Sequence, residues 1–123
     1  MAEMDVALKD ALQVDGAIAA AVVDHTSGMA LGTVGGGHGF DITVAAAANT
    51  EVLRAKLRTM DLLGLREKIE DILVTLGSQY HLIRPVAGPA GHGLFIYLAL
   101  HRDRANLALA RHQLRMIEQR LEV

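Results

Sequence analysis

Three apolar strand patterns lie close together in the second half of the chain, and this spacing constrains the fold more than any other feature. The strands are expected at residues 71–76, 80–86 and 94–100, with short turn-forming segments between them. Parallel neighbours in a sheet need a crossover of about a dozen residues or more, whereas short turns connect antiparallel neighbours. We therefore expect an antiparallel meander in which the strongly apolar segment 94–100 is a central strand.

The rest of the chain supplies two further strands and three helices. Residues 16–24 and 29–35 are expected to form a hairpin, whose glycine-rich second strand lies at a sheet edge. Apolar residues at helical spacing predict helices at residues 3–13, 42–60 and 103–121. The expected order is α-β-β-α-β-β-β-α in a single domain that spans residues 1–123. This order defines an α/β (α+β) sandwich: a five-stranded antiparallel sheet with helices on both faces.

Polar residues indicate the ends and faces of these helices. Asp41 and Asp103 are expected to cap the second and third helices, because a carboxylate accepts hydrogen bonds from the first unpaired backbone amides. Arg54 and Arg58, four residues apart, are expected to form a basic strip along the second helix. The residues expected on or near its apolar face are Ile42, Ala45, Asn49, Val52, Leu53 and Met60. The acidic residues expected at a solvated surface are Asp61, Glu67, Glu70 and Asp71.

The composition excludes several classes of function. Aromatic residues make up only 3% of the chain, which leaves few platforms on which bases could stack. The net charge is -2 and basic residues are scattered, so we expect no nucleic-acid partner. The absence of cysteine excludes disulfides and thiolate metal sites. The longest apolar run is far below the ~20 residues of a membrane-spanning helix. We therefore expect a soluble, cytoplasmic protein without membrane insertion.

The segment "GTVGGGHGFD", residues 32–41, partly matches the phosphate-binding pattern G-x-x-x-x-G-K-[ST]. Gly32 and Gly37 have the required spacing, but His38 and Gly39 stand where the lysine and the hydroxyl residue belong. Two of the three phosphate-binding and magnesium-binding groups are therefore missing. We interpret the segment as a connection between an edge strand and the second helix, in which glycines allow unusual backbone angles.

No pattern of catalytic or metal-binding residues stands out. The six histidines lie on separate elements or loops, although three from separate loops could still meet in space. They are His25, His38, His81, His92, His101 and His112. Ser27 and Ser78 lie in expected turns without the context of a nucleophile elbow. Asp24 and His25 point apart because they are neighbours at a strand end. We expect no enzymatic activity, no bound metal and no cofactor.

Two long segments and the order of elements carry a family resemblance. One segment is "VDGAIAAAVVDHTSGMALGT", residues 14–33, which follows the opening pattern V-x-G-a-x-g-a-v-v-d-x-x-G-x-x-l. The other is "GLFIYLALHRDRANLALARHQLRMIEQRL", residues 93–121, with Asn106 and Leu107 early in the last helix. Together they resemble the Roadblock/dynein light chain family, in its bacterial small-GTPase regulator type. These motifs belong to the fold and not to a catalytic site.

The resemblance implies a homodimer. In that family the edge strand after the middle helix pairs with its copy, and the two middle helices lie side by side. Here this assigns residues 71–76 to the pairing strand and residues 42–60 to the helix pair. Pairing an edge strand through dimerisation also removes an aggregation hazard. The implied interface residues are Ala45, Ala48, Asn49, Val52, Ile72 and Val74.

The resemblance also implies a non-enzymatic scaffold or regulator that binds a Ras-like small GTPase. The residues that we expect to bind this partner lie on the exposed side of the middle helix and just after it: Arg54, Arg58 and Arg66. The alternative is a small-molecule-binding sensor or auxiliary subunit on the same fold, with its ligand near residues 35–39 and His38. A hydrolase hidden in the loops is the third interpretation, and no nucleophile–base spacing supports it.

Overall fold

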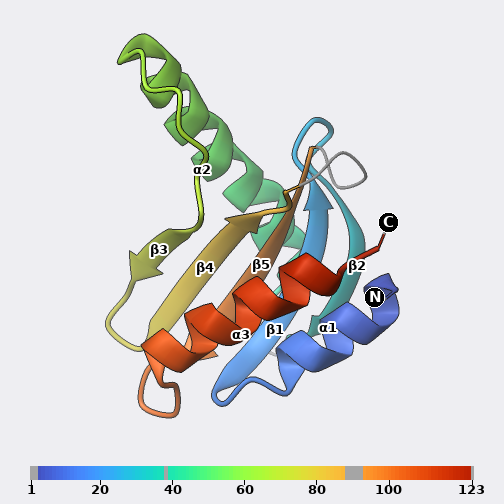
Figure 1. The fold of residues 1–123 in the computed structure, drawn as a ribbon. Coiled ribbons are helices and arrows are strands. Elements are labelled where there is room, and N and C mark those ends of the chain that lie inside the picture. Colours follow the sequence, from blue (N-terminus) through green and yellow to red (C-terminus); the bar gives the residue numbers. More distant parts are fainter. Residues whose placement is uncertain (1–2, 38, 88–92, 123) are drawn as a thin grey trace.

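A five-stranded antiparallel sheet lies between helices in the computed structural model, which describes residues 3–37, 39–87 and 93–122 (Figure 1). The elements are α1 (Met4–Leu12), β1 (Ala17–Asp24), β2 (Met29–Gly35), α2 (Ile42–Leu62), β3 (Ile72–Thr75), β4 (Gln79–Pro85), β5 (Leu94–His101) and α3 (Leu107–Arg120). This order and the fold class confirm the prediction from the sequence.

The strand order in the sheet is β2-β1-β5-β4-β3. Strands β3, β4 and β5 form the predicted antiparallel meander, and β5 is the central strand. Strand β1 pairs antiparallel with β5, which joins the N-terminal hairpin to the meander. The two edges of the sheet are therefore β2, as its glycine content predicted, and β3.

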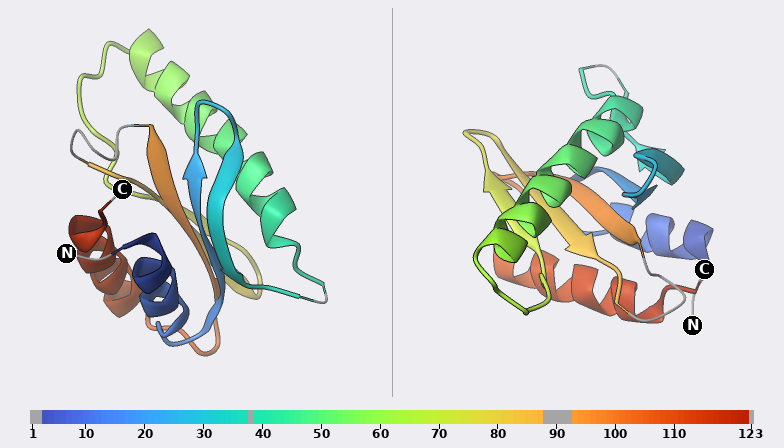
Figure 2. Two further views of the ribbon diagram at one scale, coloured as in Figure 1. Left: turned by 90° about the vertical axis from the view of Figure 1, so that its right-hand side faces the viewer. Right: turned by 90° about the horizontal axis from the view of Figure 1, so that it is seen from above.

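Helices cover both faces of the sheet: α2 lies on one face, and α1 and α3 lie on the other (Figure 2). All residues of β5 except the last are buried, because this strand is covered from both sides. Its continuous apolar sequence is the consequence of this position. One apolar cluster fills the space between the sheet and the helices α1 and α3, and includes Leu98 of β5 and Leu114 of α3. The second lies between the sheet and α2, and includes Leu53 of α2 and Phe95 of β5.

The beginning of α3 differs from the prediction. Asp103 is exposed and does not cap the helix, which begins after Asn106. The side chain of Asn106 accepts a hydrogen bond from the backbone amide of Leu109 at 3.0 Å. The chain first turns as it leaves β5, and in this turn the amide of Arg104 donates to the carbonyl of His101 at 3.2 Å. Asp103 lies within this turn, too early to reach the free amides of the helix.

Helix α2 has a core face and a separate outer face. The buried residues of the core face are Ala46, Thr50, Leu53 and Met60. Val52, which was predicted to lie on or near the same face as Leu53, is 40% exposed and belongs to the outer face. Adjacent residues of an α-helix point about 100° apart, so these two side chains cannot share a face. No helix of the described residues, α2 included, is long and apolar enough to cross a membrane.

Asp71, the acidic residue before β3, was predicted to lie at a solvated surface. The structure instead pairs it with an arginine. The two carboxylate oxygens of Asp71 accept hydrogen bonds from Nε and Nη2 of Arg111 at 2.8 and 3.0 Å. Only 10% of the Asp71 side chain is exposed. The hydrogen bonds to Asp71 raise the pKa of Arg111. This two-bond contact ties the start of the edge strand to α3 on the opposite face of the sheet.

Candidate interaction surface

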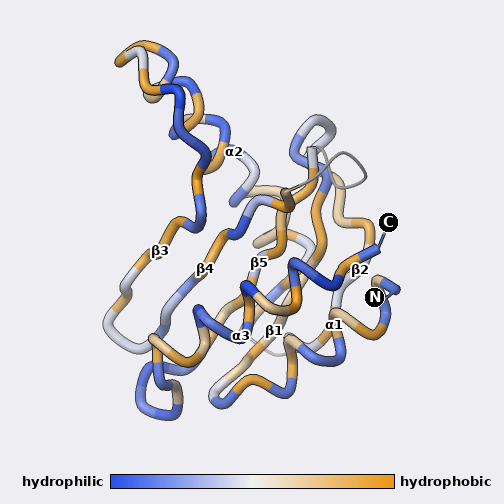
Figure 3. Tube along the Cα trace, in the orientation of Figure 1, coloured by the Kyte–Doolittle hydropathy of each residue, from blue (hydrophilic) through white to orange (hydrophobic). Residues whose placement is uncertain are grey.

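Helix α2 and the segment after it expose large apolar side chains. Val52 and Leu57 are each 40% exposed, and Leu62 at the end of the helix is 83% exposed. Leu63 and Leu65 continue this exposure beyond the helix. Figure 3 shows apolar residues along the part of α2 that projects beyond the sheet. A concentration of large exposed apolar side chains in one part of the chain makes this region a candidate interaction site.

A groove of about 460 Å³ lies between α2 and the start of β3. Its lining residues are Val52, Ala55, Lys56, Thr59, Asp71 and Ile72. Strand β3 pairs with β4 on one side, and its other side is an edge of the sheet in the described chain. An edge strand offers unpaired amides and carbonyls to another chain. We refer to the six groove residues and the open edge of β3 together as the α2–β3 surface.

The six residues predicted for a homodimer interface all lie along α2 and β3. Val52 and Ile72 line the groove together. Ala48 and Val52 are exposed, and the other four are half-buried. The side-chain amide of Asn49 donates to the carbonyl of Ala45 at 2.7 Å, so one of its polar groups is already satisfied within α2. The structure thus brings two of the predicted residues into one groove and distributes the others along the same two elements.

The three arginines predicted to bind a partner have different surroundings. Arg54 donates from Nε to the carbonyl of His25 at 2.9 Å and from Nη2 to the carbonyl of Thr26 at 2.8 Å. These bonds tie α2 to the turn between β1 and β2. Arg58 and Arg66 are exposed, and neither forms an ion pair with another described residue. Arg54 therefore has a structural role that its spacing from Arg58 did not indicate.

The glycine segment leads into a helix start that is already capped, as predicted. The Asp41 side chain accepts hydrogen bonds from the amides of Thr43 and Val44 at 3.0 and 3.1 Å. A phosphate at this helix end would need such amides, and a carboxylate there repels anions. Gly35 has a φ of +75°, and a Cβ there would lie 2.5 Å from a carbonyl oxygen of β1, which confirms the expected backbone angles. His38 lies outside the described residues.

A buried hydroxyl lies beneath α2. The Tyr97 side chain is fully buried, and its hydroxyl has no hydrogen-bond partner within the described residues. Burial raises the pKa of Tyr97 to about 12, and the nearby Asn49 side chain acts in the opposite direction. The Tyr97 ring packs edge-on against His81, with 5.5 Å between centroids, and His81 packs edge-on against Phe40. Burial lowers the pKa of His81, so this cluster is uncharged at neutral pH.

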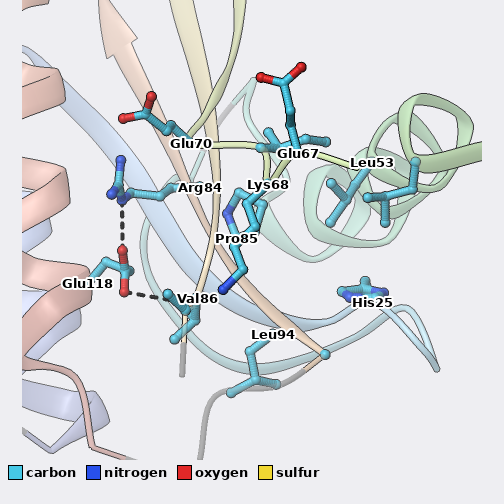
Figure 4. Close-up of a pocket in the computed structure, with 14 residues that line it drawn as sticks. His25, Leu53, Glu67, Lys68, Glu70, Arg84, Pro85, Val86, Leu94 and Glu118 are labelled. Carbon is cyan, nitrogen blue, oxygen red and sulfur yellow. Dashed lines mark hydrogen bonds and ion pairs between the residues drawn. The ribbon is translucent and has the colours of Figure 1, made fainter. Parts of the chain in front are cut away.

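A cavity of about 970 Å³ opens where β4 ends and β5 begins (Figure 4). It extends from Leu53 and Leu57 on α2 to Glu118 on α3, and most of its other lining is apolar. The charged or polar residues of its wall are His25, Glu67, Lys68, Glu70, Arg84 and Glu118. A concave wall that combines apolar side chains with convergent polar groups is typical of small-molecule sites. The described residues near Gly37, where the alternative interpretation placed a ligand, do not line this cavity.

A buried ion pair forms part of the cavity wall (Figure 4). Nε of Arg84 donates to Oε1 of Glu118 at 2.9 Å, and Oε2 of Glu118 accepts from the amide of Ala87 at 3.3 Å. Both charged residues are buried. The sequence analysis did not single them out. Two signals in the sequence could have indicated the pair. Arg84 lies inside an apolar strand pattern, and Glu118 follows Leu114 by one turn on the apolar stripe of α3. Both positions predict burial, and buried charges need partners.

The histidines do not form a metal site in the part of the chain that the structure describes. No group of three or more His, Asp or Glu side chains there could hold a metal ion. His38 and His92 lie outside that part. Asp24 accepts hydrogen bonds from the hydroxyl and the amide of Thr26 at 2.6 and 2.9 Å, and these bonds lower its pKa. Asp24 therefore shapes the turn after β1 and does not orient His25.

The arrangement of these elements is the fold of Roadblock/LC7 domain proteins, as the resemblance predicted. The structure is similar to a Roadblock/LC7 domain from Streptomyces avermitilis, with a TM-score of 0.79 and 14% identity over 96% of this chain and 93% of that chain. It is similar to MglB from Myxococcus xanthus, with a TM-score of 0.72 and 16% identity over 93% and 84%. It is also similar to MglC from Myxococcus xanthus, with a TM-score of 0.64 and 23% identity over 94% and 92%. No protein-family model matches the sequence, and comparison with curated proteins finds no match.

Proposed function

We propose that the protein is a dimeric, non-enzymatic regulator of the roadblock type that binds a Ras-like small GTPase in the cytoplasm. The observation that carries this proposal is the α2–β3 surface, which combines an open strand edge with exposed apolar side chains on a Roadblock/LC7 fold. Members of the family that the sequence resembles typically dimerise through these two elements and serve as platforms for small GTPases.

The chemistry of the α2–β3 surface supports a second copy of the chain as its first occupant. Pairing β3 with β3 of another copy would satisfy the open amides and carbonyls of both strands. A twofold arrangement is the commonest way for identical chains to associate. The residues proposed for this interface are Ala45, Ala48, Asn49, Val52, Ile72 and Val74. Apart from Asn49, they provide small or apolar side chains, which favour close contact.

The end of α2 is the proposed site for the GTPase. Leu63 and Leu65 expose apolar side chains there, and Arg58 and Arg66 expose charge beside them. Arginine is enriched at protein interfaces relative to the rest of the surface. Arg54 contributes indirectly, because its bonds to the turn after β1 hold α2 in place.

Capture of partners in two nucleotide states tests this function. One half of a lysate from the source cells is loaded with GDP and the other with a non-hydrolysable GTP analogue, and proteins retained by the tagged chain are identified by mass spectrometry. We expect a Ras-like GTPase that is enriched in one state. Arg66→Glu should reduce its retention, and Arg115→Glu on α3 should not. The absence of any GTPase from both halves would contradict the partner assignment.

Small-molecule binding is the second candidate function, and the cavity of about 970 Å³ favours it. A sensor or auxiliary subunit would be stabilised by its ligand, because a ligand that binds the folded state raises the melting temperature. A panel of nucleotides and metabolites would be tested with the wild type and with Leu57→Trp, which fills part of the cavity. A ligand that raises the melting temperature of the wild type but not of the variant supports this candidate. If no ligand in the panel changes the melting temperature, the regulator is the better supported function.

A further inference from the structure

The outer face of α2 has the spacing of a helix that packs against another helix. Exposed or half-buried residues follow one another in steps of three and four: Ala45, Ala48, Val52, Ala55, Thr59 and Leu62. This spacing is typical of the contact line between two helices that cross at about 20°. The hydroxyl of Thr59 donates to the carbonyl of Ala55 at 2.8 Å, so it needs no partner from another chain.

We propose that two copies pack their α2 helices antiparallel in one defined register, which rests on the homodimer proposed above. In this register Val52 opposes Ala55 of the second copy. Ala48 opposes Thr59 of the second copy, and Ala45 opposes its Leu62. Each layer thus places a larger side chain against an alanine, which allows the two helices to approach closely.

Flanking charges favour this register. Antiparallel helices bring the same flanking position of both helices together. Glu51 and Arg58 occupy one flank of the outer face, two turns apart, and both are exposed. In the proposed register Glu51 of each copy faces Arg58 of the other copy. The twofold axis makes this contact twice, so the two copies are complementary in charge as well as in shape.

Sliding the helices by seven residues in either direction places like charges together. In one direction Arg58 faces Arg58 of the second copy, and Lys56 on the other flank faces its own counterpart. In the opposite direction Glu51 faces Glu51 of the second copy. Like charges across an interface are unfavourable and act against these registers. The same two residues therefore stabilise one register and destabilise both neighbouring ones.

Glu51 and Arg58 are both available for this contact. Glu51 pairs through Oε1 with Arg54 at 2.8 Å, and 71% of its side chain is exposed. Arg54 stays in place without Glu51, because it also binds the turn after β1. Val52, Ala55 and Thr59 line the groove beside β3, so a second α2 on this face would also cover the groove. This inference moves Arg58 from the GTPase site to the contact between copies and leaves Arg66 for the GTPase.

Sedimentation equilibrium of four proteins tests the register: the wild type, Glu51→Arg, Arg58→Glu and the double exchange. We expect a wild-type dimer, and each single variant should weaken self-association roughly tenfold or more, because two attractive contacts become repulsive. The double exchange should return the dissociation constant close to the wild-type value. The matched control is Arg115→Glu, which makes the same charge change on the opposite face and should leave self-association unchanged. Circular dichroism of each variant checks that it is folded.

The outcomes separate the register from the dimer. Single variants that dimerise like the wild type would overturn the register and leave the homodimer intact. Weak single variants without recovery in the double exchange would overturn the Glu51–Arg58 contact. A monomeric wild type would overturn the homodimer and the register together. A second measurement uses the absence of native cysteine: Ala48→Cys combined with Thr59→Cys should form disulfides between copies, and either change alone should not. Failure of the combined variant to cross-link as a dimer would also overturn the register.

Discussion

Tyr97 carries a hydroxyl that the fold buries without a hydrogen-bond partner in the described chain. Such a group loses its hydration on folding and gains nothing in return, which typically costs about 1–3 kcal/mol. Asn49 lies close by and acts to lower the pKa of Tyr97, and one hydrogen of its amide nitrogen is donated to the carbonyl of Ala45. The sequence could not predict this situation, because the pattern of β5 indicates burial of its side chains but not which polar atoms meet them.

Tyr97→Phe should therefore keep or increase the stability of the protein. The change removes only the unpaired hydroxyl, so the free energy of unfolding should stay the same or rise by about 1 kcal/mol. Denaturation in urea at neutral pH measures the difference. Tyr80→Phe is the control, since Tyr80 is only half-buried. A loss of about 2 kcal/mol or more in Tyr97→Phe would mean that the hydroxyl has a partner.

The pH dependence of stability provides a second test of the same residue. The pKa of Tyr97 rises from 10.0 to about 12 on folding, so the unfolded chain releases this proton first as the pH increases. The contribution of Tyr97 to stability is therefore fully present below pH 10 and is lost as the pH rises from 10 to about 12. Tyr97→Phe should lose less stability than the wild type there. Equal losses in both proteins would contradict the shift.

At the scale of elements, the N-cap of α3 distinguishes the structure from the sequence-based expectation. Asn106→Ala should cost about 1 kcal/mol, because it removes the side-chain acceptor for the amide of Leu109. Asp103→Ala should change stability by less than about 0.5 kcal/mol, because this side chain is exposed in the preceding turn. Thermal and urea denaturation of the two variants measure both effects. The reverse ranking would restore Asp103 as the cap.

The ion pair between β4 and α3 should behave as a unit. Glu118→Ala should cost about 3–5 kcal/mol, because it leaves the Arg84 guanidinium buried without a partner. The combined change Arg84→Met with Glu118→Leu should recover most of this loss, since it removes both charges. Arg84→Met alone, Glu118→Leu alone and their combination form a double-mutant cycle whose urea denaturation measures the coupling, with exposed Glu122→Ala as a control. Additive effects of the two single changes would show that the pair is not coupled.

Most elements could be predicted because their signals are local. The periodicity of residues 42–60 and the apolar run of β5 depend on neighbours in the sequence, and both appear in the structure close to their expected positions. The partners of Arg84 and Asp71 could not be predicted, because each lies on α3, far away in the chain. The position of Val52 outside the core face depended on the rotation of α2 against the sheet, which a single helix pattern does not define.

For the whole molecule, the fold could be predicted from the sequence, and the candidate site could be predicted only in part. The order of elements and the resemblance together predicted the Roadblock/LC7 architecture that the comparison with known structures confirms. The same reasoning indicated α2 and β3 as the elements of interaction. The cavity that extends from α2 to α3 was missed, because its wall combines residues from six separate segments of the chain, and no local sequence pattern shows that they come together.

The central claim, that a second copy covers β3 and the outer face of α2, is tested most directly by amide hydrogen exchange at increasing protein concentration. Strand β2 is the internal control, because it is the other edge of the same sheet. We predict that peptides from β3 exchange more slowly as the concentration rises, while peptides from β2 keep their rate, since only β3 gains hydrogen bonds in the dimer. Exchange of β3 that is independent of concentration up to the highest level tested, together with a monomeric mass throughout, would contradict the account.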